Sequence, residues 1–287
     1  MSLAKPILAG GAAAAIIAGA AYLFPVFDSV KGVTRADDAE FALGTSAFAA
    51  LIGGETGGLA GLEKLGFGAG TLAGADHTML LSEAEGECAG RGIYLIRSQA
   101  TDKLALTAPH RGSDRHTGTL ASALFLETGA QAAAWNSGPR RATSKCEHAI
   151  DLARERNHLF SAFALGFAEA APDGLIVQLH GFDGDRRESL AAREAGIILS
   201  NGSEAPSARL LDLADCLSLA FAPIPVLVYP GDTGELGALS NAQGQLLREA
   251  GFDGFVHMEI SAELRAALIE DDALRGKLAT CLAEAAA

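Results

Sequence analysis

The chain is predicted to fold as an α/β protein whose mainly parallel, doubly wound sheet has helices on both faces. The first observation is that, from residue 92 onward, short apolar runs typical of buried strands alternate with longer segments of helical apolar spacing. The second is that these segments stop at turn-forming residues, such as Gly129 and the pair Pro172 and Gly174. Because parallel strands need a crossover between them, usually a helix, this alternation favours a parallel sheet.

Each element is predicted from its own pattern of apolar residues. Runs rich in Ile, Leu and Val are expected to be strands, and the first two are expected to be neighbours in the sheet. The expected strands are residues 92–97, 103–108, 130–138 (with its turn), 175–182, 195–202, 224–231 and 254–260. The expected helices are residues 119–129, 150–174, 207–221 and 261–285.

The chain divides into three parts by composition. Residues 1–27 are expected to be a signal peptide or membrane anchor helix, residues 28–85 an irregular Gly/Ala-rich region with one or two short helices, and residues 86–287 the α/β domain. A second apolar stretch, residues 41–54, is too short to span a membrane.

The leader carries an uncharged run of 21 residues, 7–27, preceded by Lys5. This run is long enough to cross a bilayer as a helix. It also suits a signal peptide, with an apolar core at 7–17 and small residues for cleavage at 18–20. Both interpretations predict export to the cell envelope or periplasm, anchored by this segment or released from it, whereas a buried Ala-rich hairpin is the alternative.

The net charge of the chain restricts its partners. A formal charge of -13 argues against non-specific binding of nucleic acid or acidic lipid, because either needs an excess of Lys and Arg. We therefore expect no nucleic-acid partner, and contact with a membrane only through the leader if it is not cleaved.

The four cysteines are widely spaced and contain no C-x-x-C pair, which excludes a zinc-ribbon pattern. If the domain is exported they can form up to two disulfides in any of three pairings, and if it is cytosolic they are buried thiols. They are Cys88, Cys146, Cys216 and Cys281.

Three predicted strands end in side chains that can bind a metal or move a proton. "LTAPH" ends at His110, "IVQLH" at His180, and "FVHME" at Glu259. Because the carboxyl ends of parallel strands lie on one edge of a sheet, residues far apart in sequence are expected to meet there.

The residue types at these ends suit a hydrolytic metal ion. His110, Asp114 and His180 are expected to bind one cation, since imidazole nitrogen and carboxylate oxygen are ordinary zinc ligands. Three protein ligands leave a coordination position for water. Glu259 is then expected to be the general base that takes a proton from that water.

Each of these residues also has a plainer interpretation. Asp114 could cap the following helix or orient a ligand, and His116 is either solvated or the reserve ligand. His180 could be a core histidine, and Glu259 could pair with Arg265.

The motifs "APHRGSDRHTG", "VQLHGF" and "VHMEISAELR" resemble those of the zinc carboxypeptidase-like amidohydrolases, which include the N-formylglutamate amidohydrolases and the phage poly-gamma-glutamate hydrolases. The resemblance covers roughly residues 92–279. It implies a phosphorylase/hydrolase-like fold, Zn²⁺ as the cofactor, His110, Asp114 and His180 as its ligands, and Glu259 as the base. Asp114 departs from the pattern, because the better-known relatives often have Glu at a different spacing.

Arginines are candidates for binding a substrate carboxylate. Arg140 and Arg141 follow a predicted strand between the first two metal-ligand motifs, and a guanidinium can clamp a carboxylate with two hydrogen bonds. Arg154, Arg156 and Asn157 are a second candidate group, although their helical spacing also suits an exposed face.

Together these features predict a zinc-dependent hydrolase of an amide bond in a peptide, an N-acyl amino acid or a gamma-glutamyl chain. Its substrate is expected to be a small molecule or peptide that carries a carboxylate. Manganese or iron also suits a His/His/carboxylate site. A non-catalytic envelope binding protein with the same fold and an integral-membrane structural protein are the alternatives.

Overall fold

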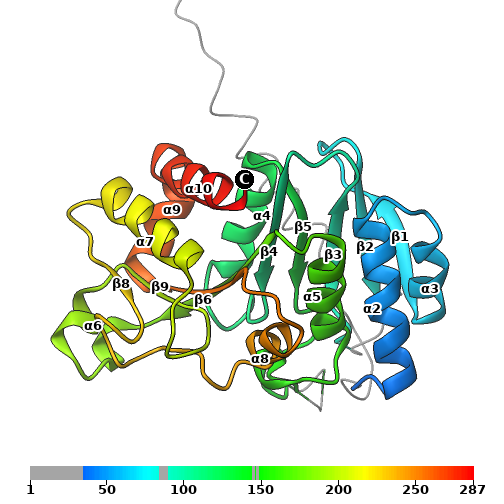
Figure 1. The fold of residues 1–287 in the computed structure, drawn as a ribbon, viewed down its shortest axis with the longest axis horizontal. Coiled ribbons are helices and arrows are strands. Elements are labelled where there is room, and N and C mark those ends of the chain that lie inside the picture. Colours follow the sequence, from blue (N-terminus) through cyan, green and yellow to red (C-terminus); the bar gives the residue numbers. More distant parts are fainter. Residues whose placement is uncertain (1–34, 84–89, 144–145, 147–148) are drawn as a thin grey trace, which may run out of the picture.

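In the computed structural model, residues 35–83, 90–143, 146 and 149–287 are described. Their strands form one nine-stranded sheet in the order β1-β2-β3-β5-β4-β6-β9-β7-β8, and helices lie against both of its faces (Figure 1). The chain is therefore a mixed α/β protein. The leader, residues 1–27, lies outside the described residues.

The sheet is mixed, which corrects the expectation of a mainly parallel one. Four strand pairs are parallel and four are antiparallel. The four central strands are parallel: β5 (Ala130–Trp135), β4 (Asp102–Ala108), β6 (Leu175–Phe182) and β9 (Phe255–Ser261). The outer strands are β1 (Phe67–Thr71), β2 (Thr78–Glu83), β3 (Ile93–Arg97), β7 (Ile197–Ser200) and β8 (Val226–Val228). β1 pairs with β2 and β2 pairs with β3, both antiparallel, so each strand reverses the direction of the one before it.

The expectation that residues 92–97 and 103–108 are neighbouring strands was wrong. β5 lies between them, antiparallel to β3 and parallel to β4. The crossover through α4 (Thr117–Glu127) returns the chain to the gap between the two earlier strands. Closeness in sequence therefore did not determine pairing.

Residues 28–85 are more ordered than the sequence indicated. Their described part contains α2 (Asp38–Ile52), α3 (Gly58–Lys64), β1 and β2, and β2 joins the main sheet through β3. Asp37 and Glu40 form a capping box at the start of α2. Phe48 of this helix is fully buried among aromatic rings. The frequent glycines interrupt the apolar pattern of this segment, so its strands were not predicted from it.

Side chains that alternate along the strands build two cores. Leu104 and Leu106 of β4 belong to the core on one face, and Ala105 belongs to the core on the other. The first core is completed by α4, α7 (Ala208–Phe221), α9 (Ala262–Glu270) and α10 (Asp272–Ala286), and the second by α2, α3, α5 (Leu159–Ala170) and α8 (Ala242–Glu249). Helices on both faces agree with the prediction.

Two predicted helices are divided. In 150–174 the α-helix begins only at Leu159, after a 3-10 turn, Leu152–Arg154. The segment 261–285 breaks at Asp271, whose carboxylate accepts hydrogen bonds from two backbone N–H groups at the start of α10. A short helix, α6 (Leu190–Glu194), lies beside β7 and β8 (Figure 1).

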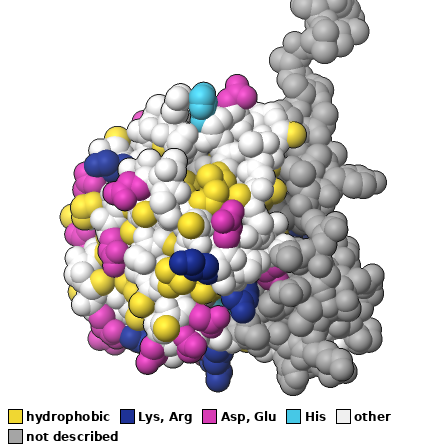
Figure 2. Space-filling model, turned by 90° about the vertical axis from the view of Figure 1, so that its right-hand side faces the viewer, with side chains coloured by type: hydrophobic (Ala, Val, Ile, Leu, Met, Phe, Trp, Pro, Cys, Tyr) yellow, Lys and Arg dark blue, Asp and Glu magenta, His cyan; other side chains and the backbone are white. Residues whose placement is uncertain are grey.

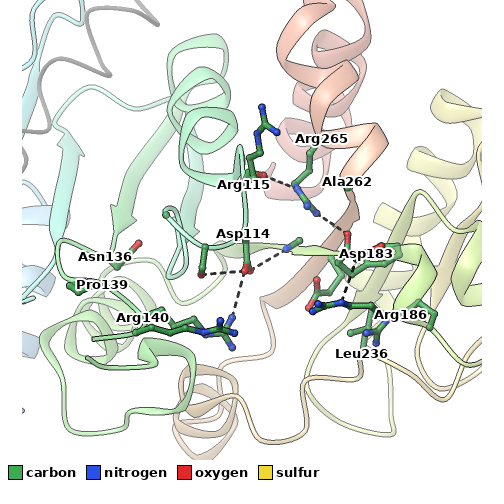
Figure 3. Close-up of a pocket in the computed structure, with 17 residues that line it drawn as sticks. Asp114, Arg115, Asn136, Pro139, Arg140, Asp183, Arg186, Leu236, Ala262 and Arg265 are labelled. Carbon is green, nitrogen blue, oxygen red and sulfur yellow. Dashed lines mark hydrogen bonds and ion pairs between the residues drawn. The ribbon is translucent and has the colours of Figure 1, made fainter. Parts of the chain in front are cut away.

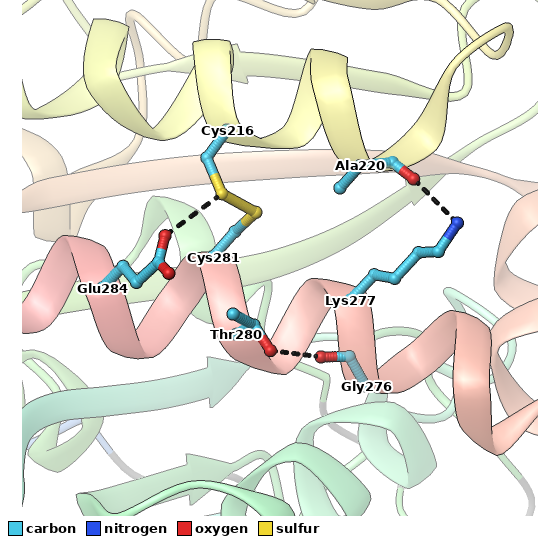
Figure 4. Close-up of a disulfide and its surroundings, with 7 residues drawn as sticks. All are labelled: Cys216, Ala220, Gly276, Lys277, Thr280, Cys281 and Glu284. Atoms are coloured by element: carbon cyan, nitrogen blue, oxygen red, sulfur yellow. Dashed lines mark hydrogen bonds between the residues drawn. A yellow bond between two sulfur atoms is a disulfide. The ribbon is translucent and has the colours of Figure 1, made fainter.

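A disulfide joins Cys216 of α7 to Cys281 of α10 (Figure 4). Cys146 is also disulfide-bonded, and Cys88 lies outside the described residues. Within the described ranges no helix combines the length and apolar character needed to cross a membrane.

Candidate active site

Three strand ends bring the predicted site residues to one edge of the sheet. His110 follows β4, while His180 of β6 lies opposite Glu259 of β9 in the parallel register. Ligand atoms of His110, Asp114 and His180 lie within 4.8 Å of one another, and so do those of His180, His257 and Glu259. The residues that were expected to meet therefore do so.

Asp114 stands at the centre of the first group. Its Oδ2 atom lies 3.3 Å from His110 Nδ1 and 3.4 Å from His180 Nδ1. The same oxygen accepts a hydrogen bond from the backbone N–H of Gly181 at 3.3 Å. The two imidazole rings are nearly perpendicular, with centroids 4.8 Å apart. Two imidazole nitrogens and a carboxylate oxygen that face one another form a donor set suited to zinc.

The far nitrogen of each imidazole is held by an oxygen acceptor. His110 Nε2 lies 2.7 Å from Asp151 Oδ1, and His180 Nε2 lies 3.0 Å from Gln178 Oε1. Gln178 Oε1 is in turn held by the side-chain amide of Asn241. These acceptors can hold the proton of each Nε2, so each Nδ1 can give up its own proton and offer a lone pair to a cation in place of its hydrogen bond with Asp114.

The electrostatics favour a bound cation. Burial disfavours ionisation of Asp114, but its hydrogen bonds with His110 and His180 outweigh burial and place its pKa well below the usual range. Burial lowers the pKa of His180. At His110 burial is outweighed by hydrogen bonds with Asp114 and Asp151, which raise the pKa. The group therefore holds a carboxylate that stays charged under all ordinary conditions.

Glu259 has the surroundings of a general base. It is 8 % exposed, and its Oε2 atom has no hydrogen-bond partner among the described residues. Burial, together with the negative charge of Asp114, raises its pKa to about 7. A carboxylate with a pKa near neutrality and a free oxygen suits proton transfer at physiological pH. The alternative, an ion pair between Glu259 and Arg265, is not formed, because that guanidinium donates to backbone carbonyls.

The sequence analysis missed His257, which lies two residues before Glu259 on the same face of β9. Its ring lies 4.3 Å from the ring of His180, and its Nε2 is 3.8 Å from Glu259 Oε1. Its Nδ1 is buried and unpartnered within the described structure. The signal was present in "VHME", since residues two apart on a strand face the same way.

Asp151 was missed too, because it begins a segment that was interpreted as one long helix. It holds His110, and its Oδ2 accepts hydrogen bonds from Arg140 at 3.0 and 3.2 Å. Arg140 Nη1 also lies 3.6 Å from Asp114 Oδ1. Arg140, one of the two predicted carboxylate-binding residues, is therefore already held by two carboxylates of the site. Figure 3 shows its approach to Asp114.

Two cavities meet at this group, and Asp114, Arg140 and Glu259 line both. The smaller, of about 420 Å³, is also lined by His110, His180 and Arg154. The larger, of about 780 Å³, receives Arg141. Arg154 is exposed and forms no ion pair with any residue that the structure describes, whereas Arg156 is bound to Glu249 away from both cavities.

The structure places the candidate ligands of the first motif differently. His116 is the residue before α4 in a left-handed conformation (φ 74°), and it is not part of either ligand group. The Asp114 side chain faces the two imidazoles, so it does not cap α4. Asp114 is thus better placed than His116 to bind a cation.

Comparison with known proteins finds likenesses only among solved structures. No known protein family matches the chain, and no curated protein matches it. The chain is similar to a metallo-carboxypeptidase from Burkholderia cenocepacia, with 10% identity, a TM-score of 0.39, and coverage of 84% of this chain and 67% of that one. It is also similar to a protein assigned as a carboxypeptidase A from Shewanella denitrificans, with 16% identity and a TM-score of 0.38 over 68% of this chain.

A third likeness is to a protein assigned as a metallopeptidase from Shewanella denitrificans, with 16% identity, a TM-score of 0.33, and coverage of 91% of this chain and 95% of that one. The chain spans about 60% of the length of the carboxypeptidase A structure. These structures are metallo-carboxypeptidases and metallopeptidases, the group that the sequence motifs resemble. Since all three TM-scores are below 0.5, the proposal that follows rests on the geometry of the site.

Proposed function

We propose that this protein is a metal-dependent hydrolase that cleaves an amide bond, with zinc held by His110, Asp114 and His180. The observation that carries the proposal is the convergence of two Nδ1 atoms and one carboxylate oxygen, each imidazole being held from behind by an acceptor. The Oε2 atom of buried Glu259, which has no hydrogen-bond partner in the described ranges, adds a proton acceptor beside them. A donor set backed in this way is typical of metal-binding sites.

The chemistry divides between the ion and the protein. When bound, zinc polarises the carbonyl of the scissile amide and favours ionisation of the attacking water. Glu259 accepts a proton from that water while the water oxygen bonds to the carbonyl carbon. Glu259 then donates the proton to the amide nitrogen, the C–N bond breaks, and a carboxylic acid and an amine are released. The pKa of Glu259, raised to about 7 by burial, suits both transfers.

The substrate is proposed to carry a carboxylate close to the scissile amide. Arg154 supports this, because its exposed guanidinium lines the smaller cavity together with the three metal-binding residues. Arg140 is held by Asp114 and Asp151, so we assign it to positioning these carboxylates as well as to the cavity wall. Arg141 lines the larger cavity and stays a candidate there.

We also propose that the protein is exported. The composition of the leader favours this, and the disulfide between Cys216 and Cys281 is of the kind that persists in oxidising compartments.

The test is metal content by plasma mass spectrometry on the full chain. We expect about one zinc per chain, lost in the His110→Ala/His180→Ala variant and kept in a His77→Ala/His116→Ala control. Hydrolysis of acylated amino acids and gamma-glutamyl peptides should fall about 100-fold or more in Glu259→Gln with zinc retained. If the wild type and both variants are folded and none of them contains metal, the proposed hydrolase is refuted, and a non-catalytic binding protein is the function that is left.

A further inference from the structure

The larger cavity concentrates positive charge in a protein that is strongly acidic overall. Its wall contains six arginines but only three acidic residues, although the chain carries a formal charge of -13. The arginines are Arg115, Arg140, Arg141, Arg186, Arg187 and Arg265. On the outer face near α2 and α3, by contrast, acidic, basic and apolar side chains are interspersed (Figure 2). The cavity is thus suited to an anionic ligand.

Arg265 is a buried cation that forms no ion pair within 4.0 Å with any residue that the structure describes. Its side chain is 6 % exposed, and its guanidinium donates to the backbone carbonyls of Arg115 (2.8 Å), Phe182 (3.4 Å) and Ile260. Within the described residues no carboxylate oxygen lies within 4.0 Å of it. The direct partners of the guanidinium are neutral carbonyls, and the carboxylates that act on its charge, Asp114 and Glu259 foremost, form no ion pair with it within 4.0 Å. A bound anion would give this buried charge a direct partner.

Arg187 offers a second donor to the same cavity. Its Nε is buried and finds no hydrogen-bond acceptor in the described part of the chain. Its ion pair with Glu235 is long, at 3.6 Å. The Glu235 carboxylate is already occupied by hydrogen bonds from the backbone N–H groups of Glu188 and Ser189 and from the Ser189 hydroxyl. The Arg187 guanidinium therefore keeps hydrogen-bonding capacity beyond its ion pair with Glu235.

These two arginines lie next to the catalytic group. Arg187 and Arg265 line the larger cavity together with Glu259, and the positive charge of each lowers the pKa of that carboxyl. Glu259 and Asp114 line both cavities, so a ligand at the metal-binding group borders each of them. The smaller cavity holds Arg154, and the larger holds Arg187 and Arg265.

We propose that Arg187 and Arg265 form a second anion subsite, which binds a carboxylate on the part of the substrate opposite to the part held by Arg154. The substrate is then an amide that joins two halves, each with its own carboxylate. This substrate class rests on the proposed amide hydrolysis, whereas the subsite itself can be tested without catalysis.

The experiment is calorimetric titration of the zinc-loaded full chain with glutarate, a dicarboxylate, and with butanoate, the matched monocarboxylate, at one ionic strength. Glutarate is expected to bind about tenfold more tightly than butanoate, because its second carboxylate binds to Arg187 and Arg265. Arg187→Gln should weaken glutarate about tenfold, and Arg187→Lys should restore part of the loss. Arg156→Gln, which removes the same charge outside both cavities, should change it less than twofold.

Equal affinity for glutarate and butanoate, or an equal loss in Arg187→Gln and Arg156→Gln, would overturn the subsite. Circular dichroism of each variant verifies folding. If glutarate binding depends on Arg187 but no amide is hydrolysed, the anion subsite is supported and the proposed amide hydrolysis is refuted. If amides are hydrolysed and glutarate binds no better than butanoate, the proposed amide hydrolysis is supported and the anion subsite is refuted.

Discussion

Replacing Glu259 with Gln should stabilise the metal-free protein at alkaline pH even though it removes the catalytic base. Burial raises the pKa of Glu259 from the usual 4.5 to about 7. Because the folded state holds the proton more tightly than the unfolded state, the wild type loses stability as the pH rises from 4.5 through 7. The difference of about 2.5 between the two pKa values corresponds to about 3 kcal/mol.

Glutamine does not titrate and has nearly the same shape, so Glu259→Gln escapes this loss. We expect its free energy of unfolding to match that of the wild type at pH 4.5 and to exceed it by about 3 kcal/mol at pH 8. Urea denaturation of both proteins with a chelator present, at four pH values from 4.5 to 8, measures the difference. A constant difference across this range would show that Glu259 is not held protonated by burial.

Three further predictions concern the support of the site and the fold. Asp151→Ala should weaken zinc binding by about 10–100-fold, because the imidazole that it holds loses its orientation, and competition with a chromogenic chelator measures this. Gly181→Ala should lower the free energy of unfolding by about 1–3 kcal/mol in urea, since the added Cβ would overlap the guanidinium of Arg265; an unchanged stability would mean that this guanidinium moves freely. Replacing Cys216 and Cys281 with serine should cost about 2–5 kcal/mol, because the disulfide closes a span of 65 residues, and reduction of the wild type should reproduce most of the loss.

Much of the site could be predicted from sequence because its residues follow apolar strands. His110 follows a strongly apolar strand and Glu259 lies within another, and both strands are buried. Parallel strands place their carboxyl ends on one edge of the sheet. Asp114 followed from its short spacing after His110. Local pattern was sufficient here, since each of these residues is positioned by the strand or turn next to it.

Residues positioned by distant segments could not be predicted in this way. Asp151 reaches His110 across 41 positions, and Arg265 donates to the carbonyl of Arg115 across 150. Neither contact leaves a periodic trace in the sequence. For the same reason the sequence indicated Arg140 only as a candidate for binding a substrate carboxylate and gave no sign of its pairing with Asp151.

The sequence by itself determined that this is an α/β protein with an acidic surface and with imidazole and carboxylate groups at the ends of central strands, because apolar periodicity and strand ends are local properties. Only the tertiary structure decided that β5 enters between β3 and β4, that residues 35–83 join the sheet, and that arginines from four segments share one cavity. Strand order and the meeting of distant charges depend on which surfaces pack together, and that is a property of the whole chain.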